Sequence, residues 1–187
     1  MVAEQRKRLF IGIACQPGRA VQRVLSELRA RAADPATGLR PVPAENLHIT
    51  LKFLGMVPVP EIAMISQIMQ QIVSRQRSLT LQLHGFGCFK QALWLGVKDN
   101  EELQHLAAGL DQALGIIGVS RQQNAFVPHL TVARLRPGAK LKLSELQATY
   151  GDRTWGELKV DTVTLFESET LPQGARYSRL FSASLGS

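Results

Sequence analysis

The chain has 187 residues, of which 45% are hydrophobic and 20% charged, and its formal net charge is +7. This length suits one domain with a sizeable core, and the composition is that of an ordinary globular protein. No apolar run approaches the roughly 20 residues that a bilayer-spanning helix needs, and no signal-peptide cleavage site follows the basic start. We therefore expect a cytoplasmic protein. Its positive charge favours an anionic partner, above all a nucleic acid.

The sequence contains two cysteines, Cys15 and Cys88, which lie far apart and outside any CxxC or Cys/His cluster. Such spacing does not indicate a metal site or a disulfide framework. We expect two separate thiols in the core.

Alternating and helical spacings of apolar residues predict the elements of the first half of the chain. A strand is expected at Arg8–Ala14, and a helix begins near Pro17, which suits a first helical turn. The proline-rich segment Ala33–Asn46 is predicted to be a loop that contacts substrate. A strand then runs over His48–Gly55, with Gly55 ending it, and Ile62–Val73 has the spacing of an amphipathic helix.

The second half is predicted in the same way, and its fold class follows from the order of elements. The expected elements are strands at Leu79–Phe86 and Ala92–Val97 with a connection at Gly87–Gln91, a helix at Glu101–Leu114, a strand at Phe126–Arg134, a short helix at Leu143–Tyr150, and closing strands at Trp155–Glu167 and Arg176–Ser184 around a turn at Pro172-Gln173-Gly174. This order indicates an α+β fold with helices outside largely antiparallel sheets.

Two of the predicted strands share a pattern of histidine, one apolar residue and threonine. The first is HITLKFLG, which begins at His48, and the second is HLTVAR, which begins at His129. Because strand side chains alternate between faces, His48 and Thr50 lie on one face, and His129 and Thr131 repeat that geometry. Two such strands can line a single cleft.

These residue types suit metal-free chemistry on a phosphate. Histidine has an unperturbed pKa of about 6.5, so one ring can be a base and the other an acid near neutral pH. In-line displacement at phosphorus needs both, from opposite sides. The threonine hydroxyls can donate hydrogen bonds to the non-bridging oxygens. The alternative is that each histidine is simply a hydrogen-bonded residue near a sheet end.

A metal site is the competing chemical interpretation of two histidines. A catalytic zinc site usually has three protein ligands, and neither motif brings a carboxylate or a third histidine. His84 and His105 lie in a predicted strand and a predicted helix, and we expect both to be structural or solvated. The sequence also contains no P-loop. We therefore predict no metal and no cofactor.

The paired motifs resemble the twin HxTx signature of the 2H phosphoesterase superfamily. The surrounding segments RPVPAENLHITLKFLG (Arg40–Gly55) and FVPHLTVARL (Phe126–Leu135) are similar to those of bacterial RNA 2',3'-cyclic phosphodiesterases, also called 2'-5' RNA ligases. The opening RLFIGIA and the closing ESETLPQGARYSRL fit as well, so the resemblance covers nearly the whole chain. It implies one bilobal, pseudo-symmetric domain over residues 1–187, with the active cleft between the lobes.

The resemblance also implies a reaction and roles in it. The reaction is hydrolysis of RNA 2',3'-cyclic phosphate ends to 2'-phosphate ends, in some members with reversible ligation. His48 takes the role of proton donor to the leaving O3', His129 that of proton acceptor from water, and Thr50 and Thr131 bind the phosphate. The residues themselves give no reason to prefer this assignment of acid and base over the reverse.

Four further residues are candidates for substrate binding. Arg134 is a cation for the phosphate, although strict alternation places it opposite His129, and an ordinary surface arginine is the alternative. Lys52 shares the predicted face of His48 and is expected at the cleft edge. Phe126 and Tyr177 are candidates to stack on a base, as aromatic residues often do with single-stranded RNA; the alternative for each is a core aromatic.

The expected substrate is RNA with a 2',3'-cyclic phosphate end, bound by a monomer. Two other functions fit the same residues. One is a phosphodiesterase acting on a small cyclic nucleotide, such as ADP-ribose 1'',2''-cyclic phosphate. The other is an RNA-binding module without catalysis, whose binding would weaken with salt.

Overall fold

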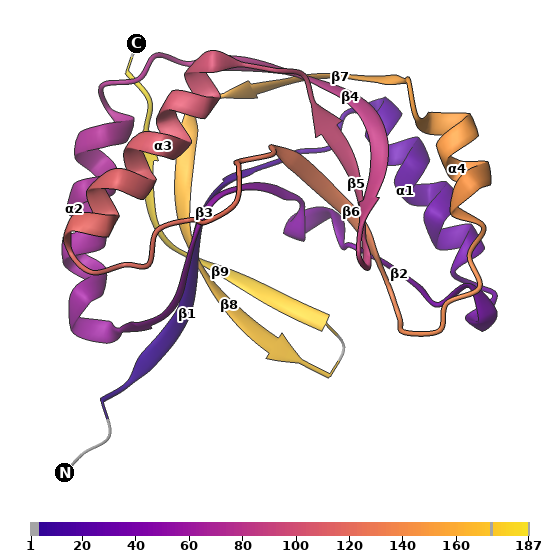
Figure 1. Cartoon of the computed structure of the whole chain (residues 1–187), viewed down its shortest axis with the longest axis horizontal. Coiled ribbons are helices and arrows are strands. Elements are labelled where there is room, and N and C mark those ends of the chain that lie inside the picture. The colour runs from indigo at the N-terminus through magenta and orange to yellow at the C-terminus, as the bar shows by residue number, and fades with distance from the viewer. Residues whose placement is uncertain (1–3, 173, 187) are drawn as a thin grey trace.

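A computed structural model describes residues 4–172 and 174–186. Within them, nine strands form one sheet in the order β7-β4-β5-β6-β3-β1-β8-β9, with β2 beside β6. Every ladder between these strands is antiparallel, and the helices lie outside the sheet (Figure 1). The predicted α+β class is therefore confirmed.

The elements follow one another in a mixed order along the chain. The strands are β1 (Arg6–Ala14), β2 (Leu39–Pro41), β3 (His48–Pro58), β4 (Leu79–Phe89), β5 (Ala92–Val97), β6 (His129–Leu135), β7 (Thr154–Val160), β8 (Thr162–Leu171) and β9 (Gly174–Ser184). The α-helices are α1 (Arg19–Arg31), α2 (Ile62–Val73), α3 (Glu101–Ile116) and α4 (Leu143–Tyr150), and the 3-10 helices are η1 (Pro35–Thr37), η2 (Ala44–Asn46) and η3 (Val59–Glu61). Among the described residues, no helix has the length and apolar character to cross a membrane.

The sheet has two halves that meet between β3 and β6. Helices α2 and α3 pack on the half that contains β3 and β9, while α1 and α4 pack on the half that contains β2, β4 and β7. Figure 1 shows these helix pairs at opposite ends of the molecule. One register pair, Ile49 with Leu130, joins the central strands. Each strand that carries a histidine motif therefore borders the other half of the sheet.

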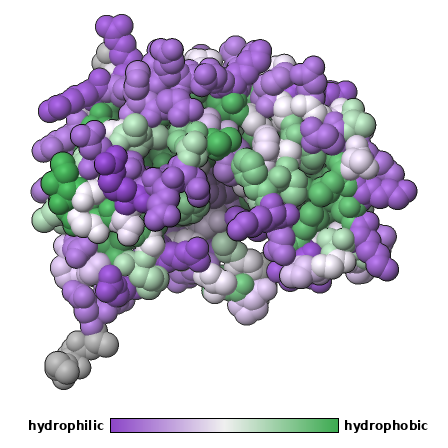
Figure 2. Space-filling model, in the orientation of Figure 1, coloured by the Kyte–Doolittle hydropathy of each residue, from purple (hydrophilic) through white to green (hydrophobic). Residues whose placement is uncertain are grey.

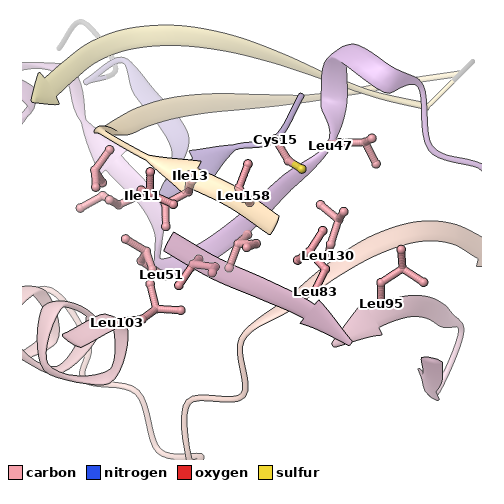
Figure 3. Close-up of a cluster of buried hydrophobic side chains, with 14 of the residues drawn as sticks. Ile11, Ile13, Cys15, Leu47, Leu51, Leu83, Leu95, Leu103, Leu130 and Leu158 are labelled. Atoms are coloured by element: carbon pink, nitrogen blue, oxygen red, sulfur yellow. The ribbon is translucent and has the colours of Figure 1, made fainter. Parts of the chain in front are cut away.

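A single core cluster lies beneath both halves. Figure 3 shows its aliphatic side chains, among them Ile11 from β1, Leu51 from β3 and Leu130 from β6. Cys15 lies in this cluster, and burial raises the pKa of its thiol to about 11. Cys88 is half-buried against the same cluster. Both cysteines are free thiols, as predicted.

Strand β3 does not end at Gly55, contrary to the prediction, but continues to Pro58. The register with β1 shifts between Leu9, which faces Gly55, and Phe10, which faces Phe53. Gly55 adopts a φ of +71°, which favours glycine. Gly55, which indicates a turn in the sequence, is therefore part of a β-bulge. The strand bends there and continues to pair with β1.

The predicted strand Trp155–Glu167 is two strands that lie far apart in the sheet. Strand β7 pairs with β4, whereas β8 pairs with β1 and β9. Asp161 separates them, and its carbonyl accepts a hydrogen bond from the amide of Leu185 at 2.8 Å. The chain crosses from one half of the sheet to the other at this residue, which the continuous alternation of the sequence hides.

Other boundaries also differ from the prediction. The expected loop Ala33–Asn46 contains β2, because Leu39–Pro41 pairs with β6. Strand β4 continues through Gly87 to Phe89, so the hairpin to β5 turns at Lys90 and Gln91, and Lys90 has a φ of 50°. Helix α3 extends beyond its predicted end to Ile116, and β6 begins at His129, three residues later than expected. Within the predicted closing turn, Gln173 lies outside the described residues.

Candidate active site

The two histidine motifs line one cleft of about 510 Å³. His48 and Thr50 come from β3, and His129 and Thr131 come from β6. Strand β1, the β4–β5 hairpin and the β8–β9 hairpin supply the remaining walls. The molecular surface is hollowed near its centre, between the two helix-covered ends (Figure 2). The four motif residues thus come together as the sequence predicts.

A β-bulge follows the threonine in each motif. On β3 the register with β1 passes from Gly12 and Thr50 to Ile11 and Lys52, so Leu51 is the extra residue. Gly12 permits this irregular pairing, because a Cβ there would lie 2.8 Å from a backbone carbonyl of β3. The next cleft-facing residue is Phe53, which is 64% exposed.

The corresponding bulge on β6 lies at Val132. Its neighbours Thr131 and Ala133 pair with Trp94 and Leu93, which leaves Val132 without a partner in that ladder. The extra residue shifts the alternation by one position. Arg134 therefore reaches the cleft, as a phosphate-binding cation must.

Both imidazoles are anchored in the same way. Nδ1 of His48 lies 2.7 Å from the carbonyl oxygen of Asn46, and Nδ1 of His129 lies 2.7 Å from that of Val127. A carbonyl only accepts, so Nδ1 carries the proton in each ring. This leaves Nε2 of each ring for the cleft. The two rings are equivalent in tautomer and differ in their surroundings.

The surroundings act on the pKa of His48. Burial lowers this pKa, and the positive charge of Arg134, together with that of His129 whenever its ring is protonated, lowers it further, against an opposing contribution from the hydrogen bond to Asn46. The neutral form of His48 is therefore favoured in the free protein. An anion bound beside Arg134 would oppose the effect of these cations, because an opposite charge stabilises the imidazolium.

Aromatic side chains surround each histidine. The centroid of the His48 ring lies 4.7 Å from that of Phe10 and 5.0 Å from that of Tyr177. The Tyr177 ring meets His48 edge-on. The His129 ring lies 5.3 Å from Phe89 in an edge-on contact. The structure thus brings Tyr177 to the cleft as predicted. It adds Phe10, Phe53 and Phe89, which line the cleft and are absent from the residues predicted to bind substrate.

The alternation of β1 contained a signal for one of these residues. Leu9 and Ile11 are buried on the core side of the strand, so the pattern leaves Phe10 on the face of the cleft. Phe53 and Phe89 gave no comparable signal. Phe53 faces the cleft because of the bulge at Leu51, and Phe89 does so because the β4–β5 hairpin turns after it.

Lys52 does not line the cleft, contrary to the prediction. The bulge at Leu51 turns its side chain inward, where the residue is 1% exposed. Its Nζ donates to Asp111 on α3 at 2.5 Å and to the carbonyl of Ser120 at 2.5 Å. Burial opposes ionisation of Asp111, but hydrogen bonds from Lys52, Gln122 and Arg121 keep its pKa below the usual value. Lys52 anchors α3 to the sheet.

Phe126 is not among the cleft residues either, so the structure does not place it where it was expected to stack on a base. It lies before β6 and packs, half-buried, against the hydrophobic core. The alternative given by the sequence, a core aromatic, describes it.

His84 and His105 lie away from the cleft, as predicted. His84 pairs with Asp152 at 3.1 Å, and His105 is exposed on α3. Within residues 4–172 and 174–186, no group of three or more His, Cys, Asp or Glu side chains is arranged to hold a metal ion.

The chain is similar to known proteins over most of its length. The model of the 2'-5' RNA ligase superfamily matches residues 17–171. A protein of Archaeoglobus fulgidus named RNA 2',3'-cyclic phosphodiesterase is 29% identical over 92% of this chain and 97% of that relative. One of Thermotoga maritima with the same name is 31% identical over 90% of this chain and 91% of that relative.

Solved structures show the same fold. The crystal structure of E. coli LigT complexed with 3'-AMP covers 98% of this chain and 100% of its own, with a TM-score of 0.76 and 28% identity. The crystal structure of TT0787 of Thermus thermophilus covers 95% of this chain and 97% of its own, with a TM-score of 0.74 and 25% identity.

Proposed function

Because the chain belongs to the 2'-5' RNA ligase superfamily, we propose that it hydrolyses RNA 2',3'-cyclic phosphate ends to 2'-phosphate ends. The observation that carries this proposal is the shared cleft, in which two histidines offer Nε2 and two threonines offer hydroxyl groups. The names of the relatives from Archaeoglobus fulgidus and Thermotoga maritima support the same substrate class.

The proposed reaction is an in-line displacement at phosphorus. Nε2 of His129 accepts a proton from water as the water oxygen forms a bond to phosphorus. Nε2 of His48 donates its proton to O3' as the bond between phosphorus and O3' breaks. The bond to O2' remains, so the product carries a 2'-phosphate and a free 3'-hydroxyl. Proton exchange with solvent then restores both rings.

The remaining cleft residues stabilise the charge that grows on the non-bridging oxygens. The hydroxyls of Thr50 and Thr131 donate hydrogen bonds to these oxygens. Arg134 supplies a cation, and the guanidinium suits phosphate because it donates two parallel hydrogen bonds. The exposed ring of Phe53 and the ring of Tyr177 offer faces on which the terminal base can stack.

Both rings are anchored alike, so their hydrogen bonds do not distinguish the acid from the base. The assignment of His48 as the acid and His129 as the base is taken from the family resemblance. Binding of the phosphodiester anion supports His48 as the acid. The anion raises a pKa that burial and the neighbouring Arg134 lower in the free protein. The histidine thus becomes a proton donor when substrate is present.

The proposed chemistry uses no metal, and a chelator tests this together with the activity. An oligoribonucleotide with a 2',3'-cyclic phosphate end is incubated with the protein in the presence of excess EDTA. We expect hydrolysis at the rate measured without EDTA. Inhibition that added zinc reverses would contradict the metal-free mechanism and leave the reaction class intact. No hydrolysis under either condition would contradict the proposed function.

A small cyclic nucleotide is the second candidate substrate. The cleft volume of about 510 Å³ favours it, because pockets of this size hold a single small ligand. Joining of RNA ends through a 2'-5' linkage would use the same residues: a 5'-hydroxyl replaces water as the nucleophile that His129 deprotonates, and O3' leaves with the proton of His48. A monomeric state and a cytoplasmic location stay predictions from the sequence.

A further inference from the structure

A second cavity of about 870 Å³ opens beside the cleft. Arg134, Ala175 and Tyr177 line both spaces, so the two are continuous along β6 and β9. The wider cavity, which we call the arginine groove, runs between the segment Arg40–Asn46, the end of β6 and the β8–β9 hairpin. None of the motif residues lines it.

The groove is positively charged. Arg40, Arg134, Arg136 and Arg176 line it, and Glu45 is the one carboxylate among its described lining residues. Arg176 pairs with Glu169 at 2.6 Å, so its charge is partly neutralised. Within the described part of the chain, no carboxylate lies within 4.0 Å of the other three guanidinium groups.

Two of these arginines face each other across a ladder. Arg40 on β2 and Arg134 on β6 are register partners, which places their Cβ atoms about 4.5–5.5 Å apart. Like charges in this position destabilise a sheet. A bound anion reduces that repulsion, which favours a second phosphate at Arg40, beside the one that Arg134 contacts in the cleft. The arginine pair lies where the groove meets the cleft, because Arg134 lines both.

Part of the groove lining is apolar. Val42, Leu135 and Leu171 line it together with prolines of the adjoining segments. Such a surface suits the flat faces of bases, while guanidinium groups bind the phosphates between them and can stack on the bases. Its volume lies at the upper end of the range for ligand pockets, which exceeds the needs of one nucleotide.

We infer that the arginine groove binds the RNA strand preceding the cyclic phosphate end, and that Arg40 and Arg136 contact its phosphates. This inference rests on the proposed function. A 2',3'-cyclic phosphate is the 3' end of an RNA, so the rest of the strand leaves the cleft on the 5' side of the last ribose. The groove offers that strand a basic path. The polymer, rather than a small cyclic nucleotide, is then the preferred substrate.

The test compares two substrates with and without the arginines of the groove. The substrates are a decaribonucleotide with a 2',3'-cyclic phosphate end and the mononucleotide 2',3'-cyclic AMP. In the double variant Arg40→Ala/Arg136→Ala we expect kcat/KM for the oligonucleotide to fall on the order of tenfold or more, as for two lost charge-assisted contacts. Turnover of the mononucleotide stays within about twofold of the wild type, because it does not reach these residues.

The salt dependence gives a second readout. Each contact to a single-strand phosphate contributes about 0.7 to the slope of log affinity against log salt concentration. The slope for oligonucleotide binding should therefore shrink by about 1.4 in the double variant. The matched control is Arg23→Ala/Arg75→Ala, which removes the same charge from exposed positions outside both cavities.

The outcomes separate this inference from the proposed function. Equal loss for both substrates, no loss for either, or the same loss in the control variant would overturn the groove as a strand-binding site while the reaction stands. A wild-type protein that hydrolyses neither substrate would instead contradict the proposed function itself. Equal efficiency of the wild type on both substrates would also count against the groove.

Discussion

Asn46 holds His48 from one side and the β8–β9 hairpin from the other. Its carbonyl lies 2.7 Å from Nδ1 of His48, and its side-chain Nδ2 donates to the carbonyl of Ala175 at 2.8 Å. Ala175 lines both the cleft and the arginine groove. The position of the histidine and the shape of the cleft wall therefore depend on one residue, which makes Asn46 a positioning residue.

We expect Asn46→Ala to lower kcat/KM about 3–10-fold, the effect of one lost neutral hydrogen bond. The backbone carbonyl remains, so His48 keeps its tautomer and the pH profile keeps its shape. The control is Asn100→Ala, which removes the side-chain cap that accepts a hydrogen bond from Leu103 at the start of α3. That change should cost about 1 kcal/mol of stability and leave kcat/KM unchanged. Equal activity of the two variants would contradict the positioning role.

His48→Ala and His129→Ala should each lower the hydrolysis rate on the order of 10²–10⁴-fold, because each removes an acid or a base. His105→Ala, at an exposed position on α3, is the control and should be fully active. The rate is measured on a cyclic-ended oligonucleotide with each variant shown to be folded by circular dichroism. Near-native activity of either cleft variant would remove that histidine from the mechanism.

The pKa of His48 should lie below its usual value of about 6.5 in the free protein and rise when an anion binds. Proton NMR of the ring follows both values, with and without 2'-AMP as a product analogue. Arg134→Ala should also raise the pKa, because it removes a neighbouring cation. A free-protein pKa above 6.5, or one that 2'-AMP leaves unmoved, would contradict this electrostatic account.

The same shift has a consequence for stability. Because the folded-state pKa is lower than the unfolded one, the unfolded chain binds more protons between the two values. The contribution of His48 to folding is therefore fully present above about pH 6.5 and is lost as the pH falls through the folded-state pKa. Substituting His48 with Gln should weaken the loss of thermal stability between pH 7 and pH 5.

Lys52→Ala should destabilise the fold by about 1–3 kcal/mol, since it removes the buried ion pair with Asp111 and the donor to the carbonyl of Ser120, while Asp111 keeps its hydrogen bonds from Arg121 and Gln122. The free energy of unfolding in urea measures this loss. At a temperature where the variant is folded, the KM for a cyclic-ended substrate should equal that of the wild type, because Lys52 does not line the cleft. A raised KM with unchanged stability would restore the substrate-binding role that the sequence suggests.

Arg40→Ala should leave the protein as stable as the wild type or more stable by about 0.2–1 kcal/mol, because it relieves the repulsion with Arg134. The gain should shrink as salt screens the two charges. Thermal unfolding at low and high ionic strength measures it. A clear loss of stability would mean that Arg40 makes a stabilising contact and that its repulsion with Arg134 does not destabilise the fold.

The sequence predicts the two motif strands well because their chemistry and their alternation agree. His48 and Thr50, and likewise His129 and Thr131, need only a two-residue period to share a face. The prediction fails immediately after each threonine. A bulge depends on the register with a neighbouring strand, and no local pattern in β3 records where β1 places Gly12 and Ile11.

These bulges explain the errors among the binding residues. Strict alternation places Lys52 in the cleft and Arg134 outside it, and the structure reverses both. The sequence also does not reveal that the strand is interrupted at Asp161. Only one residue separates β7 from β8, so the alternation of apolar residues continues across it. The arginine groove is equally invisible in the sequence, because Arg40 and Arg134 become neighbours through the short strand β2, which a proline-rich segment disguises as a loop.

The central claim is that two imidazoles act on one phosphorus and expel O3'. The position of the phosphate on the product tests it most directly. An oligoribonucleotide with a 2',3'-cyclic phosphate end is hydrolysed, and the product is compared by phosphorus NMR with 2'-phosphate and 3'-phosphate standards. We predict the 2'-phosphate alone. A 3'-phosphate product, or an unchanged cyclic end, would contradict the account.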